Sequence, residues 1–176
     1  ESAFPQAVQL RNGDLLCSFN VGGGHFVTGG TDWARSRDGG YSWDVEGTIL
    51  PATLRPASTN ALKLSISSDR KVVYAYGSRS YTANEDRFGH TENEAVFCRS
   101  DDGGENWSDP HVVPFQFEGS LEVSHGILVL SSGRMLAPAA TLPEGRLGEK
   151  VLAAISDDGG STWRSEVVIF KDPEHK

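Results

Sequence analysis

The chain lacks the features that mark several common classes of protein. It has two cysteines, Cys17 and Cys98, and one methionine among 176 residues, so the sequence predicts no disulfide framework. Its apolar runs reach only about seven residues, whereas a membrane-spanning helix needs about 20. No signal peptide is recognisable. We therefore expect no membrane partner, and both cysteines, which stand in apolar runs, are predicted to be buried free thiols.

Basic residues are also scarce. The 16 lysines and arginines are outnumbered by 24 aspartates and glutamates, which gives a net charge of −8. Because nucleic-acid binding depends on neutralising phosphates, we expect no nucleic-acid partner. No His, Cys or Asp residues stand at a recognised metal-ligand spacing, so the sequence predicts no metal, and no cofactor is expected.

Glycine, by contrast, is abundant and recurs in a fixed phrase. The pattern Ser-x-Asp-Gly-Gly-x-x-Trp occurs at residues 36–43, 100–107 and 156–163. The copies stand about 60 residues apart, which is too long for a helical-hairpin repeat and suits a four-stranded propeller blade. The sequence is therefore built from three repeated units.

The segments between the phrases repeat as well. Residues 7–19, 62–76 and 126–140 each contain an apolar run, a tight polar turn and a second apolar run. A third short run precedes each phrase and a fourth follows it. Four strands per unit without a convincing helix predict a β-propeller. We place the blades at about residues 1–52, 53–116 and 117–176.

The phrase itself is predicted to be a hairpin staple. Its aspartate is expected to accept backbone N–H groups across the turn, its glycine pair permits left-handed backbone, and its tryptophan packs back on the sheet. The alternative is a carbohydrate- or calcium-binding loop, but calcium needs more oxygen ligands at alternating positions. The structural residues are Asp38, Trp43, Asp102, Trp107, Asp158 and Trp163.

The three phrases resemble the Asp box, or bacterial neuraminidase repeat, of sialidases and related six-bladed propeller proteins. The resemblance covers essentially the whole chain. It implies an all-β, sialidase-like six-bladed β-propeller architecture, with this chain supplying three four-stranded blades. The remaining blades would come from the rest of a longer chain or from a homodimer mate. The resemblance slightly favours a secreted or periplasmic protein, although the sequence leaves the localisation unknown.

Candidate site residues gather at one end of the predicted blades. In a meander the long connections share one face, and here they are residues 20–30, 51–59, 78–93, 116–125 and 142–149. Function usually lies where long loops gather on a rigid scaffold. Carboxylates and arginines together suit a carbohydrate ligand, since glycoside hydrolysis uses acidic groups and an arginine matches a sugar carboxylate.

Particular roles are assigned on this face. Asp32 is the predicted general acid and His25 a second catalytic residue. The predicted substrate-binding residues are Arg79, Asp86, Arg87, Glu118 and His125. His125 and Gly126 also match the end of the segment that opens the third blade of sialidases.

The sequence departs from sialidases where their first arginines are expected. Ala3-Phe4-Pro5 stands in place of their Arg-Ile-Pro motif, and Asn20-Val21-Gly22 has no second arginine. We therefore expect a sialidase-like glycan-active protein, a glycoside hydrolase relative acting from the chain end on a polar or acidic sugar, with true sialidase activity doubtful. The alternatives are a non-catalytic propeller module that binds a glycan or protein, and a scaffold that recruits partner blades. Whether the chain is an enzyme is left open.

Overall fold

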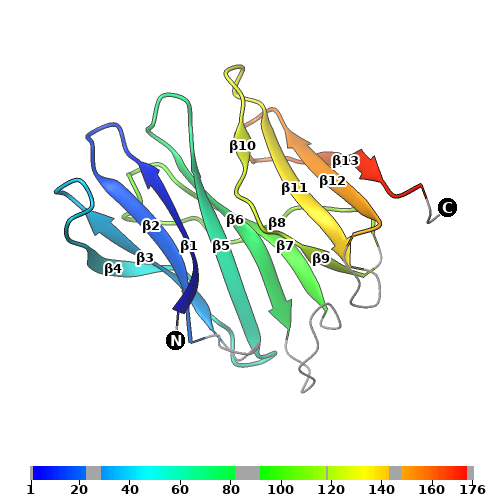
Figure 1. The fold of residues 1–176 in the computed structure, drawn as a ribbon, viewed down its shortest axis with the longest axis horizontal. Helices are drawn as coiled ribbons and strands as arrows, with labels where there is room; N and C mark the ends of the chain where they lie inside the picture. Colours follow the sequence, from blue (N-terminus) through cyan, green and yellow to red (C-terminus); the bar gives the residue numbers. More distant parts are fainter. Residues whose placement is uncertain (1, 23–28, 82–91, 118, 143–147, 174–176) are drawn as a thin grey trace.

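The structure is a computed structural model that describes residues 2–22, 29–81, 92–117, 119–142 and 148–173 (Figure 1). These residues form antiparallel sheets in which neighbouring strands follow one another along the chain. The first sheet consists of β1 (Ser2–Gln9), β2 (Leu15–Val21), β3 (Gly30–Ser36) and β4 (Asp44–Leu50). The second consists of β5 (Ser58–Ile66), β6 (Val73–Tyr81), β7 (Asn93–Ser100) and β8 (His111–Val112).

The third sheet differs in its first strand, which is broken in two. β9 (Ser120–Glu122) and β10 (Leu128–Val129) both pair with β11 (Met135–Leu142), followed by β12 (Lys150–Ser156) and β13 (Arg164–Lys171). The prediction of an all-β chain with three four-stranded antiparallel units is confirmed, with the first strand of the third unit in two pieces. Within the described ranges, no helix is long and apolar enough to cross a lipid bilayer.

Two apolar cores lie between the sheets. Side chains of a strand alternate between its two faces, so Leu16 and Trp33 of the first sheet meet Leu62 and Val96 of the second. The opposite face of the second sheet, with Tyr76 and Phe97, packs against the third. The third sheet contributes Val123, Met135, Ala137 and Ala139 to this core. The second sheet is buried on both faces, which explains the nearly continuous apolar runs of β6 and β7.

The first strands of the sheets lie next to one another. β5 contacts β1 on one side and β10 on the other, whereas β4, β8 and β13 fan apart. We refer to the edge formed by β1, β5, β9 and β10 as the inner edge (Figure 1). Side chains from all three sheets can therefore meet there.

The short turns share one end of the molecule. The β1–β2, β5–β6 and β10–β11 turns lie together at the top of Figure 1. The N–H of Arg11, in the first of these turns, donates to the carbonyl of Arg70 in the second at 3.2 Å. The connections between sheets therefore run at the opposite end, as the meander predicts.

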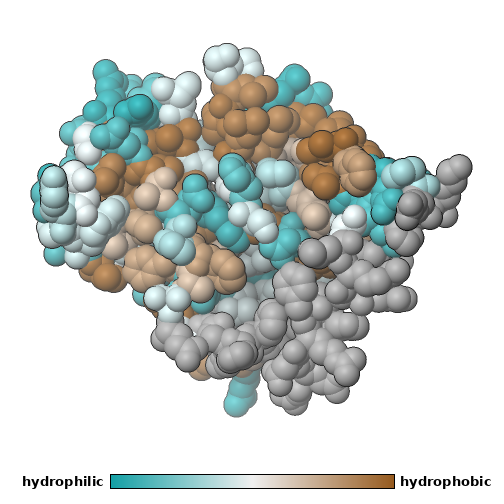
Figure 2. All heavy atoms as spheres, viewed as in Figure 1, coloured by the Kyte–Doolittle hydropathy of each residue, from teal (hydrophilic) through white to brown (hydrophobic). Residues whose placement is uncertain are grey.

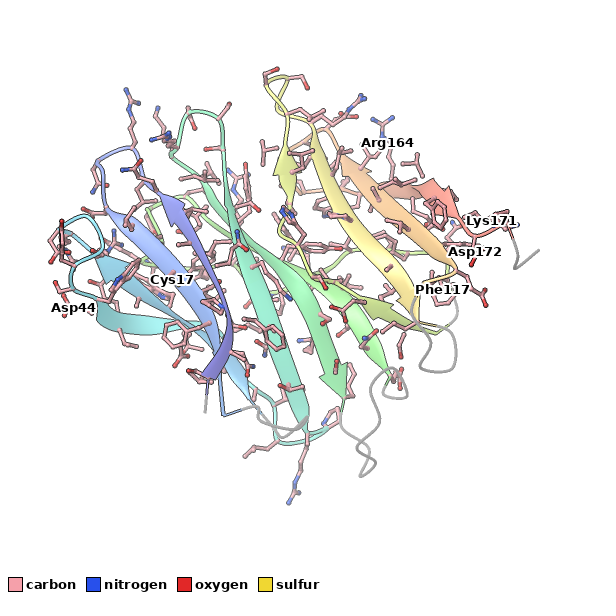
Figure 3. All side chains as sticks on the ribbon, viewed as in Figure 1. Cys17, Asp44, Phe117, Arg164, Lys171 and Asp172 are labelled. Atoms are coloured by element: carbon pink, nitrogen blue, oxygen red, sulfur yellow. The ribbon has the colours of Figure 1, made fainter. Side chains whose placement is uncertain are left out.

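The outer face of the third sheet is largely apolar. Leu136, Pro138 and Ala140 of β11 are half-buried on the face turned away from the second sheet, and Figure 2 shows apolar residues over this part of the third sheet. β13 exposes Val167, Ile169 and Phe170. On the first sheet, Cys17 is half-buried on the corresponding outward face (Figure 3), while Cys98 is fully buried. Both thiols are free, as expected, but only Cys98 is in a core.

Candidate functional site

The three Ser-x-Asp-Gly-Gly-x-x-Trp turns, which we name the DGG turns, have the same hydrogen bonds. In the second, Ser100 Oγ donates to Asp102 Oδ1 at 2.7 Å and accepts the N–H of Gly104 at 2.8 Å. Asp102 also accepts the backbone N–H and the side-chain amide of Asn106, at 3.0 and 2.8 Å. The first and third turns repeat this pattern around Asp38 and Asp158.

These contacts occupy the aspartates. The hydrogen bonds from Asn106 lower the pKa of Asp102 to about 2, and those from Thr162 do the same for Asp158. The pKa of Asp38 lies well below its usual value, chiefly because of Ser42. Both oxygens of each carboxylate are engaged within the turn, so the geometry agrees with the hairpin-staple interpretation. Trp107 and Trp163 pack against the two cores, while Trp43 of the first turn is 41% exposed.

Each later DGG turn is fastened to the preceding sheet. Arg35, the residue before the first turn, donates from Nη2 to the carbonyl of Gly103 in the second turn at 2.9 Å. Arg99, the residue before the second turn, donates from Nη1 to the carbonyl of Gly159 in the third at 3.4 Å. The equivalent residue of the third sheet is Ile155, which has no donor. We refer to this arginine-to-glycine hydrogen bond as the latch.

Asp32, the predicted general acid, lies on β3. Because Thr31 and Trp33 face the second sheet, Asp32 points to the outward face of the first sheet. It is half-buried, and its Oδ1 accepts the hydroxyl of Thr48 from β4 at 2.7 Å. The first sheet therefore stands between Asp32 and the second sheet.

Arg79, the predicted substrate clamp, is engaged by its register partner Glu94. Its Nε and Nη2 donate to Glu94 Oε1 at 2.9 and 2.5 Å, and the hydroxyl of Tyr81 donates to the same oxygen at 2.5 Å. Burial raises the pKa of Glu94, but the hydrogen bonds from Tyr81 and Arg79 more than offset this and leave it lowered. Arg79 faces the first sheet from the second, so the structure does not bring it together with Asp32.

His125 lies between β9 and β10, where the first strand of the third sheet is broken. It is exposed, and its Nδ1 is 2.8 Å from the carbonyl oxygen of Gly126. A Cβ at Gly126 would lie 2.5 Å from Ser65 Oγ and 2.9 Å from the carbonyl oxygen of Leu64. Only glycine allows this close approach of the third sheet to β5. The other predicted site residues, His25, Asp86, Arg87 and Glu118, lie outside the described residues.

A further group on the inner edge was not predicted from the sequence. Lys63 of β5 is only 8% exposed, and its Nζ donates to the carbonyls of Val123 at 2.6 Å and Ala61 at 3.2 Å. The ring of Phe4, on β1, lies with its centre 5.4 Å from Nζ. Burial lowers the pKa of Lys63, and the charge of Glu122 opposes this effect. The signal available in the sequence was a lysine between two leucines, in a strand with no other charged residue.

Asn20, which stands where a second arginine was sought, serves the interface between sheets. Its Nδ2 donates to the carbonyls of Gly30 at 3.1 Å and Asn60 at 2.6 Å. Thr31 donates from Oγ1 to the side-chain oxygen of Asn60 at 2.6 Å. These buried polar groups satisfy one another. Among the described residues, no three His, Cys, Asp or Glu side chains are grouped so that they could hold a metal ion.

No family model and no curated protein matches the sequence. Solved structures do match its fold. The microbial sialidase Hz136 from the Hadza has 16% identity and a TM-score of 0.67, and the match covers 94% of this chain and 37% of that one. The intramolecular trans-sialidase of Ruminococcus gnavus, in complex with oseltamivir carboxylate, has 12% identity and a TM-score of 0.73, covering 97% and 61%.

The likeness extends beyond sialidases. The α-L-arabinanase of Penicillium chrysogenum, complexed with arabinobiose, has 18% identity and a TM-score of 0.66, covering 98% of this chain and 50% of that one. The chain has the fold of sialidases and other glycoside hydrolases. It spans between 37% and 61% of the length of these three proteins.

Proposed function

We propose that the chain is part of a sialidase-like six-bladed β-propeller that acts on glycans, and that each sheet is one blade. The observation that carries this proposal is the match of nearly the whole chain to glycoside hydrolases of different specificity. In this proposal the DGG turns are Asp boxes, and their role is structural. The glycan binds at the end formed by the connections between sheets.

The proposed reaction is hydrolysis of a glycosidic bond at a chain end. Asp32 is the proposed general acid, and His25 assists it. The Thr48 hydroxyl bonds to one carboxylate oxygen of Asp32, which fixes the orientation of the carboxyl group. Arg79, Asp86, Arg87, Glu118 and His125 are the proposed contacts to the sugar. The absence of an arginine at Ala3 disfavours true sialidase activity.

The test uses a panel of fluorogenic glycosides of neutral and acidic sugars. For the substrate that is cleaved, Asp32→Asn is expected to lower kcat/KM by about 10²–10⁴-fold, the usual contribution of a general acid. The β-sheet signal in circular dichroism should be the same for Asp32→Asn as for the wild type. The matched control is Asp44→Asn, at the exposed start of β4, which should retain full activity. Equal activity of the two variants would contradict the role of Asp32.

A second candidate is a non-catalytic module that binds glycans. It is favoured by the placement of Asp32 and Arg79 on opposite sides of the first sheet, which separates an acid from a substrate clamp. Saturable glycan binding without release of product from any glycoside of the panel would support this candidate over the hydrolase.

The apolar outward face of the third sheet supports the proposal that the ring is completed by further blades. Large contiguous apolar surfaces are rare on soluble monomers, and the matched structures are longer than this chain. We propose that these blades come from the rest of a longer chain or from a second copy. A solution mass of twice 19.0 kDa by light scattering would identify the second copy, and a mass of 19.0 kDa would favour the longer chain.

A further inference from the structure

The inner edge carries very little charge. On β1, β5, β9 and β10, Lys63 is the one cation and Glu122 the one anion. Lys63 lies close to Phe4 of the first sheet and interacts with the charge of Glu122 of the third, so each of the three sheets contributes one member of the group. Because these residues are far apart in the sequence, only the fold brings them together.

The ammonium group of Lys63 is already engaged. Two of its N–H groups donate to the carbonyls of Val123 and Ala61, and the ring of Phe4 lies over it. A lysine ammonium has three donors, and a cation over an aromatic face is stabilised by the ring. With 8% of its surface exposed, Lys63 holds Phe4 and the broken strand in place and does not present a free cation to a ligand.

The groups that remain accessible suit a sugar without charge. Phe4 is 61% exposed, and its ring offers a flat apolar surface against which the C–H face of a sugar ring can stack. Glu122 is half-buried, its Oε1 accepts the hydroxyl of Ser124, and a carboxylate forms strong hydrogen bonds with hydroxyl donors. Ser124 and His125 are exposed beside it.

A carboxylated sugar would fit this group poorly. Its negative charge would approach Glu122, and like charges that are close together repel each other. Lys63, the one cation of the inner edge, is buried and donates to two carbonyls, so it offers a sugar carboxylate no exposed hydrogen-bond donor. The accessible groups of the inner edge therefore favour a neutral sugar over a carboxylated one.

We propose that the inner edge binds a neutral sugar residue, stacked on Phe4 and hydrogen-bonded through its hydroxyls to Glu122. This inference rests on the proposed glycan activity and deepens it by naming the substrate class. It also assigns Lys63 the role of a buried support for the aromatic platform.

The test measures binding to the whole 176-residue chain by saturation-transfer NMR and titration calorimetry. The probes are arabinobiose and galactobiose as neutral sugars, and N-acetylneuraminic acid and galacturonic acid as acidic ones. We expect the neutral probes to bind at least tenfold more tightly. Phe4→Ala should weaken their binding at least tenfold, whereas Phe4→Tyr should retain it. The control, Tyr41→Ala, removes an aromatic ring that is 93% exposed in the first DGG turn and should change nothing.

A second variant tests the charge argument. Glu122→Gln removes the negative charge and keeps the size, so the acidic probes should gain affinity relative to the neutral ones. Tighter binding of acidic probes to the wild type, or neutral binding that Phe4→Ala leaves unchanged, would overturn the inference and leave the proposed glycan activity standing. A lack of binding of every probe would also overturn the inference, and the fluorogenic glycoside panel would decide the proposed glycan activity separately.

Discussion

The second glycine of the DGG turn provides an internal series in which one substitution meets three environments. Gly40, Gly104 and Gly160 have nearly the same backbone, with φ of +99°, +95° and +90°. An alanine at any of them incurs the cost of a left-handed conformation, about 1–2 kcal/mol. Because this cost is common to all three, differences between the variants report how tightly each turn lies on the preceding sheet.

The surroundings differ sharply. A Cβ at Gly40 would lie 3.6 Å from Leu15 Cδ1, an ordinary contact. At Gly104 it would lie 2.8 Å from Leu16 Cδ1, the end of a flexible side chain, and at Gly160 it would lie 2.4 Å from the ring of Phe97. Overpacking a core costs about 1–3 kcal/mol. We therefore expect total losses in free energy of unfolding of about 1–2 kcal/mol for Gly40→Ala, about 2–3 for Gly104→Ala and about 3–5 for Gly160→Ala.

The assay is urea unfolding followed by tryptophan fluorescence, since three of the four tryptophans stand in the DGG turns. The first turn is the control, because it has no preceding sheet among the described residues. If the losses of the three variants agree within about 0.5 kcal/mol, the usual error of additivity between independent sites, the reasoning is refuted. A larger loss at Gly40 than at Gly160 would also refute it.

Two further predictions concern charge. Arg35→Met should lower the free energy of unfolding by about 2–3 kcal/mol, because it removes the partner of Asp14 and one of the two arginines that pair with Glu46, whose side chains are 19% and 23% exposed. Arg99→Met should lower the free energy of unfolding by only about 0.5–1 kcal/mol, because its partner Asp101 is 64% exposed. Equal losses for Arg35→Met and Arg99→Met in urea unfolding would contradict this difference. The pKa of Asp102, about 2 when folded against a usual 3.8, means that its stabilising contribution is full above about pH 4 and is lost as the pH falls towards 2. Asp102→Asn should therefore show a shallower loss of stability than the wild type over that range in acid titrations of unfolding, and equal slopes would count against it.

Local structure was predictable because the DGG turns depend on residues that are close in the sequence. Ser100, Asp102 and Asn106 bond within one hairpin, so the phrase alone carries the information. The strand pattern followed from apolar runs separated by polar turns. The break between β9 and β10 was not visible, because it depends on the contact of Gly126 with β5 of another sheet.

Contacts between sheets could not be predicted in the same way. The latch joins Arg35 to Gly103, 68 residues away, and the sequence around one residue does not indicate that the other is its partner. Arg79 was predicted to bind substrate, and its pairing with Glu94 could not be predicted because it depends on the register of β6 and β7. The side of the sheet on which Asp32 lies was accessible in principle, since it alternates with the buried Trp33.

The latch gives the row of sheets a direction. At each junction an arginine that precedes one DGG turn donates to a glycine carbonyl in the next turn, so the donor and the acceptor belong to different repeats. Exchanging the second and third sheets would place Ile155, which has no donor, where Arg99 now serves, and would leave one glycine carbonyl without its donor. The residues at the junctions therefore fix the order of the repeats. A duplicated repeat can form a latch on both sides only if it has an arginine before its DGG turn and the glycine pair within it. Because Ile155 has no donor, the third sheet cannot form a latch to a DGG turn that follows it.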